Sequence, residues 1–363
     1  MSGRSPASVA PSVSAVVINY NGGERTLRCL EALSRQTCAP ERIVVVDNGS
    51  EDGTPEQIRS RLPHVEIIEV GENRGLPAAR NIGLEAVASD FVLLADSDVY
   101  LEPDALAVLL RAQADTGATV IVPRIRLIPE RDVVQCDGAA PHFIGTMTLL
   151  HGYRPVDAVP VDRRAVPGCI GACYLLDRQR VLDAGGFDAA YFIYFEDLEF
   201  MLRLTAYGHD FVCEPAALVY HERAQGTVGL SFRGKGSYPP RRAYLHMRNR
   251  WLTILMHYRL RTLLLLLPVL AFYEVIVLAF AVSRGWTRQW LLGWSWVLGN
   301  LPDILRRRSI VQRTRVRDDR DLLLGGPLPL TPGLIRAPVL AAAVSALSAA
   351  LNAYWRVARR IAG

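Results

Sequence analysis

The chain has 363 residues, which suffices for one large domain or two ordinary ones, and its formal net charge is +5 at pH 7. Hydrophobic residues make up 50% of it, a share that is high for a wholly soluble protein and suggests contact with lipid. Six cysteines are scattered without a CxxC pair, which excludes a zinc knuckle or a disulfide framework. Arginines crowd the apolar half after Arg223, which favours an anionic membrane surface over nucleic acid as a partner.

Strand and helix patterns alternate through the first third of the chain, after a small polar stretch, 1–12, that is expected to be disordered. Apolar and β-branched runs predict strands over residues 13–18, 41–47, 65–70, 91–95 and 120–123. Helical spacing or a leading proline predicts helices over 24–36, from Pro55, over 78–87 and over 103–118. Strict alternation implies an α/β protein with a parallel sheet and right-handed crossovers.

Polar side chains follow each of the first four predicted strands. They are Asn19 and Asn21, then Asp47 and Asn48, then Asn73 and Arg74, and finally Asp96 and Asp98. The carboxyl ends of parallel strands meet at one edge of a sheet, so these side chains are predicted to line one crevice. Two carboxylates one residue apart suit a hard divalent cation whose other positions are filled by substrate phosphates and water. Ordinary turn chemistry at Asp47 and solvated positions for Arg74 and Asp98 are the alternatives.

These motifs resemble those of family 2 glycosyltransferases, the large inverting group with the GT-A fold, and are most similar to its bacterial rhamnosyltransferase-like branch. The matching stretches are Val17–Asn21, Val46–Thr54, Asn73–Gly83 and Asp96–Asp98, and the resemblance extends over residues 13–251. It implies a Rossmann-like, mostly parallel sheet flanked by helices, which binds a nucleotide-sugar donor.

The resemblance also implies roles for single residues on the donor side. Asp47 contacts the nucleotide base, Asn73 and Arg74 lie beside the nucleotide, and Asn19 and Asn21 belong to the same donor site. Asp96 lies near the ribose, and Asp98 binds the Mg²⁺ or Mn²⁺ ion that bridges the donor diphosphate. Many relatives in this branch carry an asparagine in place of Asp96, and the Asp-Ser-Asp form found here favours metal dependence.

A second chemical centre lies in the stretch Gly185–Arg203, where four aromatic residues precede Glu196 and Asp197 at the start of a predicted helix. Taken alone, this is an acidic helix start, which the helix dipole favours. Aromatic faces suit sugar rings, however, and a low local dielectric raises the pKa of a carboxyl towards the range of a general base. The resemblance makes Asp197 the base that deprotonates the acceptor hydroxyl. Glu196 binds the acceptor or holds Asp197, and Glu199 and Arg203 are weaker candidates.

Two further candidates follow along the chain. His221 ends a short predicted strand, and family members often carry a histidine near this place beside the metal or diphosphate. Imidazole suits a borderline cation such as manganese, whereas a core or surface histidine is the alternative. Arg248 lies with Arg241, Arg242 and Arg250 on a predicted helix after a Gly-rich loop, 226–236, that could close over the donor. This helix is expected to face phosphates of the donor or of a lipid-linked acceptor, and a solvated face is the alternative.

Three apolar runs occupy the C-terminal part. Residues 263–282 are long enough to span a bilayer, residues 290–301 are shorter, and residues 339–357 are rich in alanine. A spanning hairpin of the first two with an interfacial third helix is favoured, and three interfacial helices are the alternative. The expected organisation is a GT-A catalytic domain, 13–251, with a nucleotide-sugar half, 13–123, and an acceptor half, 124–251. A membrane-associated helical region, 252–363, follows.

The sequence thus predicts an inverting, metal-dependent glycosyltransferase that moves a sugar from a nucleotide-diphosphate donor to a lipid-linked or cell-envelope glycan acceptor, without nucleic acid as a partner. The first residues lack the apolar core of a signal peptide, so the catalytic domain is expected on the cytoplasmic side of the inner membrane. A processive polysaccharide synthase is disfavoured because no QxxRW-type signature follows the Glu-Asp motif. An inactive GT-A membrane scaffold is disfavoured because all the expected carboxylates are present.

Overall fold

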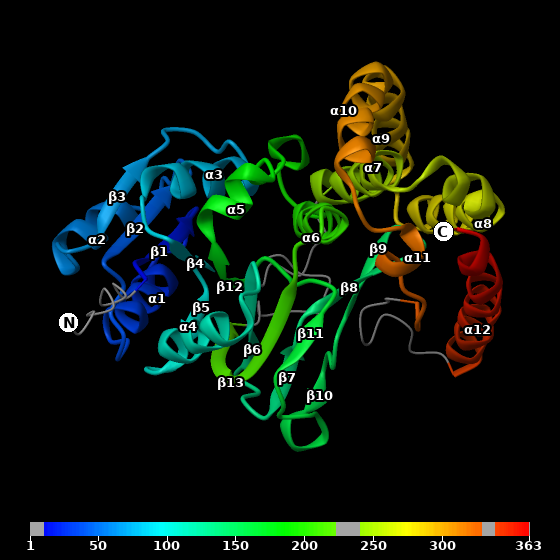
Figure 1. The fold of residues 1–363 in the computed structure, drawn as a ribbon. Coiled ribbons are helices and arrows are strands. Elements are labelled where there is room, and N and C mark those ends of the chain that lie inside the picture. Colours follow the sequence, from blue (N-terminus) through cyan, green and yellow to red (C-terminus); the bar gives the residue numbers. More distant parts are fainter. Residues whose placement is uncertain (1–10, 223–239, 329–337, 363) are drawn as a thin grey trace, which may run out of the picture.

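The structure is a computed structural model that describes residues 11–222, 240–328 and 338–362. The expected alternation of strands and helices is present in its first part (Figure 1). The elements are β1 (Val13–Asn19), α1 (Glu24–Ser34), β2 (Arg42–Asp47), α2 (Thr54–Arg61), β3 (Glu66–Glu69), α3 (Leu76–Ala86) and β4 (Phe91–Asp96). The four strands are parallel and lie in the order β3-β2-β1-β4. The predicted α/β class and the shared strand edge are therefore confirmed.

The following part of the chain adds antiparallel strands to this parallel core. Its elements are β5 (Val99–Leu101), α4 (Ala105–Thr116), β6 (Val120–Ile128), β7 (Val133–Cys136), β8 (Ala139–His142), β9 (Thr146–Leu149), β10 (Arg154–Pro155), β11 (Arg164–Val166), β12 (Cys173–Asp177), α5 (Arg178–Asp183), α6 (Glu196–Ala206) and β13 (Phe211–Glu222). Strands β8 and β9 pair with each other in a separate two-stranded sheet. Strand β12 is antiparallel to both of its neighbours, β4 and β6. The chain reaches β12 from β11 through a loop, and antiparallel neighbours need no helical crossover. The sheet is therefore mixed.

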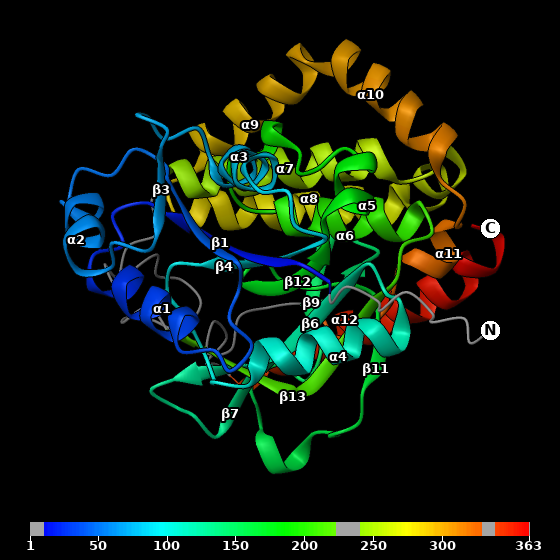
Figure 2. The ribbon, with the colours of Figure 1, turned by 60° about the vertical axis from the view of Figure 1, so that its left-hand side comes forward.

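Two apolar layers bury the two faces of this sheet. Side chains alternate along β1, so that Ala15 and Val17 pack with α1, α2 and α4, whereas Val16 and Ile18 pack with α3 and α6. Figure 2 shows the central strands between α1 and α4 on one side and α3 and α7 on the other. Burial on both faces explains why the parallel strands read as continuous apolar runs.

The C-terminal part is helical and packs onto the domain that contains the sheet (Figure 1). Its helices are α7 (Pro240–His257), α8 (Leu260–Ser283), α9 (Thr287–Gly299), α10 (Leu301–Thr314), α11 (Asp319–Leu322) and α12 (Pro338–Ile361). The apolar core that contains Val16 continues into Leu266 of α8 and into Leu351 and Trp355 of α12. The Trp355 ring stacks on Phe143, with 5.2 Å between the ring centroids. The two parts of the chain therefore share one hydrophobic core.

Within the described residues, one helix is long and apolar enough to cross a membrane, namely α8 with 24 residues. The expected hairpin is wrong in its second half. Helix α9 has 13 residues, about 20 Å at the rise of an α-helix, which falls short of a hydrocarbon core of about 30 Å. The Gly-rich loop 226–236 and most of the expected disordered stretch 1–12 lie outside the described residues.

Candidate active site

The ends of β1, β2 and β4 bring three of the predicted donor-side residues together. In the parallel register Asn19 lies opposite Asp47, and Ile18 lies opposite Asp96. The Asn19 amide donates to Asp47 Oδ1 at 2.6 Å and to Ser50 Oγ at 2.9 Å. Asp47 also accepts bonds from the Ser50 hydroxyl and backbone N–H. The Asp47 carboxylate is buried at 3% exposure and is fixed in orientation by the three bonds it accepts.

The loop after β3 is tied to the same edge by Asn48. The Asn48 side chain donates to Asn73 Oδ1 at 3.1 Å and accepts from the Arg74 backbone N–H at 3.0 Å. Asn21 is fixed nearby, since its side chain accepts from the Glu51 N–H and its backbone N–H donates to Ser50. Asparagine therefore organises the backbone here, while the Arg74 side chain is exposed to solvent.

Asp96, Asp98 and His221 form an acidic group at the end of β4. His221 lies on β13, where its partner in the sheet is Val99, and its Nε2 is 3.4 Å from Asp98 Oδ1. Burial raises the pKa of Asp96 to about 6, because the repulsion from Asp98 adds to desolvation and Arg80 offsets only part of it. For His221, burial lowers the pKa, but Asp98 outweighs burial and the net direction is upward.

This group fits the predicted divalent cation. One carboxylate and one imidazole are suitable ligands for Mn²⁺, and the other ring nitrogen of His221 lies 2.8 Å from Gln135 Oε1, the second hydrogen bond that orients a metal-binding histidine. Among the described residues, no group of three or more His, Cys, Asp or Glu side chains could hold a metal ion. The substrate diphosphate and water would therefore have to supply the remaining ligands.

Glu196 and Asp197 begin α6, as predicted. Burial raises the pKa of both carboxyls, and for Glu196 the repulsion from Asp197 raises it further. Asp197 nevertheless accepts hydrogen bonds from the backbone N–H groups of Leu198 and Gly171, which favour its charged form. The pair thus has one carboxyl with local support for its charge and one, Glu196, that resists ionisation.

Arg80 connects the two acidic centres and was given no role in the sequence reasoning. Its guanidinium, 1% exposed, donates to Asp96 Oδ1 at 3.1 Å and to the Gly171 carbonyl at 2.7 Å. Its Nη1 lies 3.8 Å from Glu196 Oε1. The signal was present in the sequence, because a cation at a buried position of α3 needs an acidic partner. Donor-side and acceptor-side carboxylates therefore lie around one buried cation.

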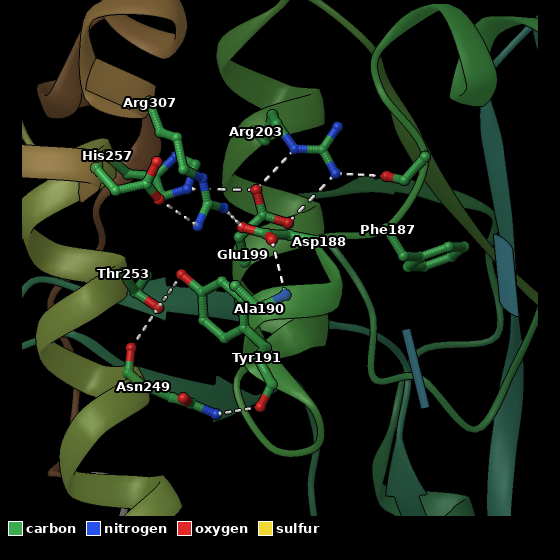
Figure 3. Close-up of polar contacts among 12 residues, drawn as sticks. Phe187, Asp188, Ala190, Tyr191, Glu199, Arg203, Asn249, Thr253, His257 and Arg307 are labelled. Atoms are coloured by element: carbon green, nitrogen blue, oxygen red, sulfur yellow. Dashed lines mark hydrogen bonds and ion pairs between the residues drawn. The ribbon is translucent and has the colours of Figure 1, made fainter. Parts of the chain in front are cut away.

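The turn before α6 is conformationally strained. Phe192, Tyr194 and Phe195 have φ values of 62°, 67° and 68°, in the left-handed region that bulky residues avoid. Asn249 of α7 holds this turn with its amide, which donates to the carbonyls of Tyr191, Ile193 and Tyr194 at 2.7–3.0 Å. Figure 3 shows the Asn249 side chain directed at the Tyr191 carbonyl. Strain of this kind persists only where the surroundings enforce it.

The side chain of Arg248, which was predicted to bind the donor, is engaged with backbone carbonyls and an aromatic ring. Its guanidinium donates to the carbonyls of Ala190 and Tyr191 at 2.7 and 3.0 Å and lies 4.6 Å from the Trp296 ring centroid. Burial lowers its pKa. Arg250 is likewise buried and binds the Ile144 carbonyl and Glu274. The arginines of this helix bind carbonyls and a carboxylate of neighbouring elements. The charge pattern of the sequence does not distinguish this role from phosphate binding.

A buried polar network connects α6 to the neighbouring helices α7 and α10 (Figure 3). Glu199 forms an ion pair with Arg203 at 2.7 Å and lies 3.4 Å from His257 Nε2. Burial raises the pKa of Glu199, but Arg203 and His257 outweigh burial and bring it to about 2. Arg307 of α10 forms an ion pair with Asp188, just before the strained turn. Glu199 and Arg203, the weaker candidates, therefore have a structural position in the protein interior.

A mixed sheet with the parallel core β3-β2-β1-β4, acidic residues at the carboxyl edge of that core and a neighbouring helix that begins with a Glu-Asp pair define a GT-A glycosyltransferase fold. The family model described as glycosyl transferase family 2 matches residues 14–135, and that described as glycosyl transferase family group 2 matches residues 91–304. The chain belongs to glycosyltransferase family 2, and it is an enzyme that uses a nucleotide-sugar donor.

Individual glycosyltransferases are also similar to this chain. The N-acetylglucosaminyl-diphospho-decaprenol L-rhamnosyltransferase of Mycobacterium tuberculosis is 31% identical over 236 residues, which covers 58% of this chain and 76% of that protein. The succinoglycan biosynthesis protein ExoO of Rhizobium meliloti is 33% identical over 129 residues, 35% of each chain. The crystal structure of GalNAc-T7 with UDP, GalNAc and Mn²⁺ has a TM-score of 0.54 at 16% identity, over 69% of this chain and 48% of that one.

Proposed function

We propose that the protein transfers a sugar from a nucleotide-diphosphate donor to a hydroxyl of a lipid-linked glycan acceptor, with inversion at the anomeric carbon. The observation that carries this proposal is the position of Arg80 between Asp96 and Glu196. It brings the predicted donor and acceptor centres to one edge of the sheet, where two substrates can meet. Proximity of this kind is a large part of the advantage of a two-substrate enzyme.

On the donor side, the nucleotide is bound along the edge formed by Asn19, Asn21, Asp47, Asn73 and Arg74. Asp96 lies at the ribose in this proposal. The buried Asp47 acts through one remaining acceptor site and through the backbone geometry it fixes. Arg74, which is exposed, is free to approach phosphate from solvent. Arg248 has no part in this site.

Asp98 and His221 would hold a Mg²⁺ or Mn²⁺ ion. When bound, such an ion offsets the negative charge that develops on the departing nucleoside diphosphate. The proposal is supported by the donor set and by the solved structure of GalNAc-T7, whose description names Mn²⁺ with UDP.

On the acceptor side, Asp197 takes the proton of the acceptor hydroxyl. The hydroxyl oxygen forms a bond to the anomeric carbon while the bond from that carbon to the diphosphate oxygen breaks on the opposite face. The raised pKa of the Asp197 carboxyl makes this residue a stronger base than an ordinary aspartate. Glu196, whose pKa is raised further by Asp197, contributes a neutral carboxyl that donates a hydrogen bond to the acceptor or holds Asp197.

The acceptor is proposed to be a sugar linked to a polyprenyl diphosphate, presented at the cytoplasmic side of the inner membrane. Support comes from the mycobacterial relative, whose name specifies such an acceptor, and from the exposed apolar helix α8. One sugar is added per acceptor, in contrast to a processive synthase.

The test is transfer from a panel of nucleotide sugars to polyprenyl-diphosphate-linked acceptors, measured as nucleoside diphosphate release and product mass. Asp197→Asn should reduce turnover by about 10³-fold or more, in the range lost with a general base. The matched control Asp183→Asn, on the exposed side of α5, should retain wild-type turnover. Near-normal transfer by a folded Asp197→Asn protein, or long polymeric products, would refute the mechanism or the single-transfer proposal respectively.

The metal assignment is tested separately by Mn²⁺ binding in the presence of a nucleoside diphosphate, followed by calorimetry. Asp98→Asn and His221→Ala should each weaken binding by about tenfold or more, because each removes a ligand. Asp104→Asn, at the exposed start of α4, is the control. Unchanged binding in both site variants would remove these residues from the metal site.

A further inference from the structure

Helix α8 has two faces of opposite character along its whole length. On the inner face, Thr262, Leu266, Val269 and Leu270 are buried, Tyr273, Glu274, Val277 and Leu278 are half-buried, and Ala281 near the end is buried again. The outer face is apolar and exposed, with Leu260, Leu264 and Val275 each 64–65% accessible to solvent. A helix that crosses lipid alone has no reason to bury one continuous stripe against a catalytic domain. The helix is therefore built to lie along the protein surface.

The only charged residue of the α8 apolar run, Glu274, lies on the inner face and is fully engaged. Its Oε2 accepts from Arg250 Nη1 at 2.9 Å and from the Trp251 indole at 2.8 Å, both on α7. Its Oε1 accepts from the indoles of Trp290 and Trp294 on α9, at 2.7 and 3.0 Å. Separating α8 from α7 would leave two buried charges, those of Arg250 and Glu274, without their partners, which is strongly destabilising.

Both ends of α8 are also tied to the catalytic side. The Arg259 backbone N–H, just before the helix, donates to Asp319 Oδ2 at 2.7 Å. After its end, the chain turns at Gly285 and α9 runs back along α8, so that Trp290 meets Glu274. Helix α9 continues to α7, where Trp296 covers Arg248 beside the strained turn. The segment that follows α8 is thus part of the cytoplasmic body of the proposed enzyme.

The outer face of α8 continues onto α12. The two helices pack together, with the Tyr354 hydroxyl donating to the Leu265 carbonyl. Helix α12 is also two-sided: Trp355 and Ala358 are buried, whereas Val357 and Ile361 are exposed. Figure 1 places α8 and α12 together, on the side of the molecule away from α1 and α2. Exposed apolar side chains on two helices that pack together mark a contact with another phase or molecule.

Arginines at the edges of this apolar surface indicate what kind of partner binds it. Arg284 and Arg288 follow the end of α8, and Arg356, Arg359 and Arg360 lie on the exposed side of α12, between its apolar residues. Apolar side chains flanked by arginine match the boundary between acyl chains and anionic headgroups. Repulsion among so many arginines disfavours a second copy of the chain as the occupant.

We infer that the outer face of α8 and α12 is a bilayer-binding surface, on which the protein lies, and that α8 does not cross the membrane. The inference rests on the proposed function for the acceptor that such a surface would reach. It replaces a spanning anchor with a monotopic one, in which both ends of α8 are on the catalytic side. The protein would then take a lipid-linked substrate from the membrane plane without extending across it.

Vesicle binding tests the surface. Full-length protein in detergent is diluted into vesicles of phosphatidylethanolamine and phosphatidylglycerol and floated on a density gradient. The double variant Leu264→Glu/Val275→Glu should reduce the vesicle-bound fraction about tenfold or more, because two apolar contacts with lipid are lost. The control Val161→Glu, at a side chain 73% exposed elsewhere, should bind as the wild type. Wild-type binding by the double variant, or a change only in its oligomeric state, would overturn the inference.

Cysteine labelling in cells tests the topology. Ser283→Cys, at the exposed end of α8, is compared with Ser309→Cys on α10, in a Cys38→Ser background because the other five native thiols are buried. Both should react with a membrane-impermeant maleimide only after the cells are permeabilised. Labelling of Ser283→Cys in intact cells, or its failure to react in either condition, would overturn the inference. Neither experiment measures sugar transfer. Both therefore test the membrane surface even if the proposed function is wrong.

Discussion

Arg80 is the residue on which the acidic edge of the sheet depends. Three carboxylates, Asp96, Glu196 and Asp197, lie close enough to affect one another's ionisation. A buried cation among them lowers the cost of holding this charge in one place. Arg80 also fixes the Gly171 loop, where an added Cβ would lie 2.4 Å from its Nη2. Its role is thus both electrostatic and steric.

Arg80→Gln should destabilise the folded protein by about 3 kcal/mol, as expected for removing one partner of a buried ion pair. Transfer activity should fall as well, because the pKa values of Asp96 and Asp197 rise when their cation is lost. Thermal unfolding and turnover are the measurements. Arg74→Gln, at an exposed cation of the same segment, should leave the melting temperature unchanged. Equal melting temperatures for the two variants would contradict this account.

The raised pKa of Asp197 predicts the pH dependence of transfer. A base acts in its deprotonated form, so kcat/KM should fall as the pH is lowered through this pKa, which lies above the ordinary aspartate value. Glu196→Gln should preserve this acidic limb and remove the ionisation of Glu196 from the profile. Because burial raises both pKa values, protonation favours the folded state, and stability should decrease as the pH rises through them. A rate that stays constant down to about pH 4 would exclude Asp197 as the base.

At the scale of elements, the strained turn and α7 act as one unit. The turn supplies Phe195, the residue before Glu196, and three of its carbonyls depend on one asparagine amide. An unpaired buried carbonyl costs about 1–3 kcal/mol, which is comparable to the cost of one residue in the left-handed region. Loss of Asn249 would therefore release the turn and shift the start of α6.

Asn249→Ala should lower kcat more than it raises KM, because it displaces the base without removing a substrate contact. The melting temperature should fall by several degrees, as expected for about 2 kcal/mol. Asn300→Ala, whose amide bonds only to the Trp296 carbonyl one turn away, is the control. Rescue of kcat by Asn249→Asp is not expected, since a carboxylate cannot donate to three carbonyls. A variant with wild-type kcat would show that the turn keeps its conformation without the Asn249 amide.

Sequence patterns predicted the elements that depend on local signals. The parallel strands, their polar ends and the acidic start of α6 all follow from hydrophobic period and turn residues near in sequence. The antiparallel insertion of β12 was missed, because strand direction depends on a partner far along the chain. The carbonyl contacts of Arg248 were not foreseen, since a cation that binds carbonyls and one that binds phosphate look alike in sequence. The sequence pattern indicates that Arg80, as a cation at a buried position of α3, needs an acidic partner, but the identity of that partner depends on the juxtaposition of α3 and α6, which no spacing reveals.

At the scale of the whole molecule, the C-terminal helices belong to the catalytic body. Trp355, 2% exposed, packs on Phe143 within the core that reaches the central sheet. Trp355→Ala should lower the free energy of unfolding by about 3–5 kcal/mol, as large-to-small changes in a core do. Val357→Ala, on the exposed side of α12, should have little effect when both are compared by thermal unfolding. A small effect of Trp355→Ala would mean that α12 is a detachable appendage.

Four consecutive residues of α7 face in two directions. Arg248 and Asn249 hold the carbonyls of the strained turn, while Arg250 and Trp251 hold Glu274 of α8. One helical turn of α7 therefore connects α8 to the turn that precedes Asp197, the proposed base. We expect interfacial activation: empty liposomes should accelerate transfer even to a water-soluble acceptor, and the stimulation should vanish in Glu274→Gln. The enzyme would in that case work fastest where its substrate resides.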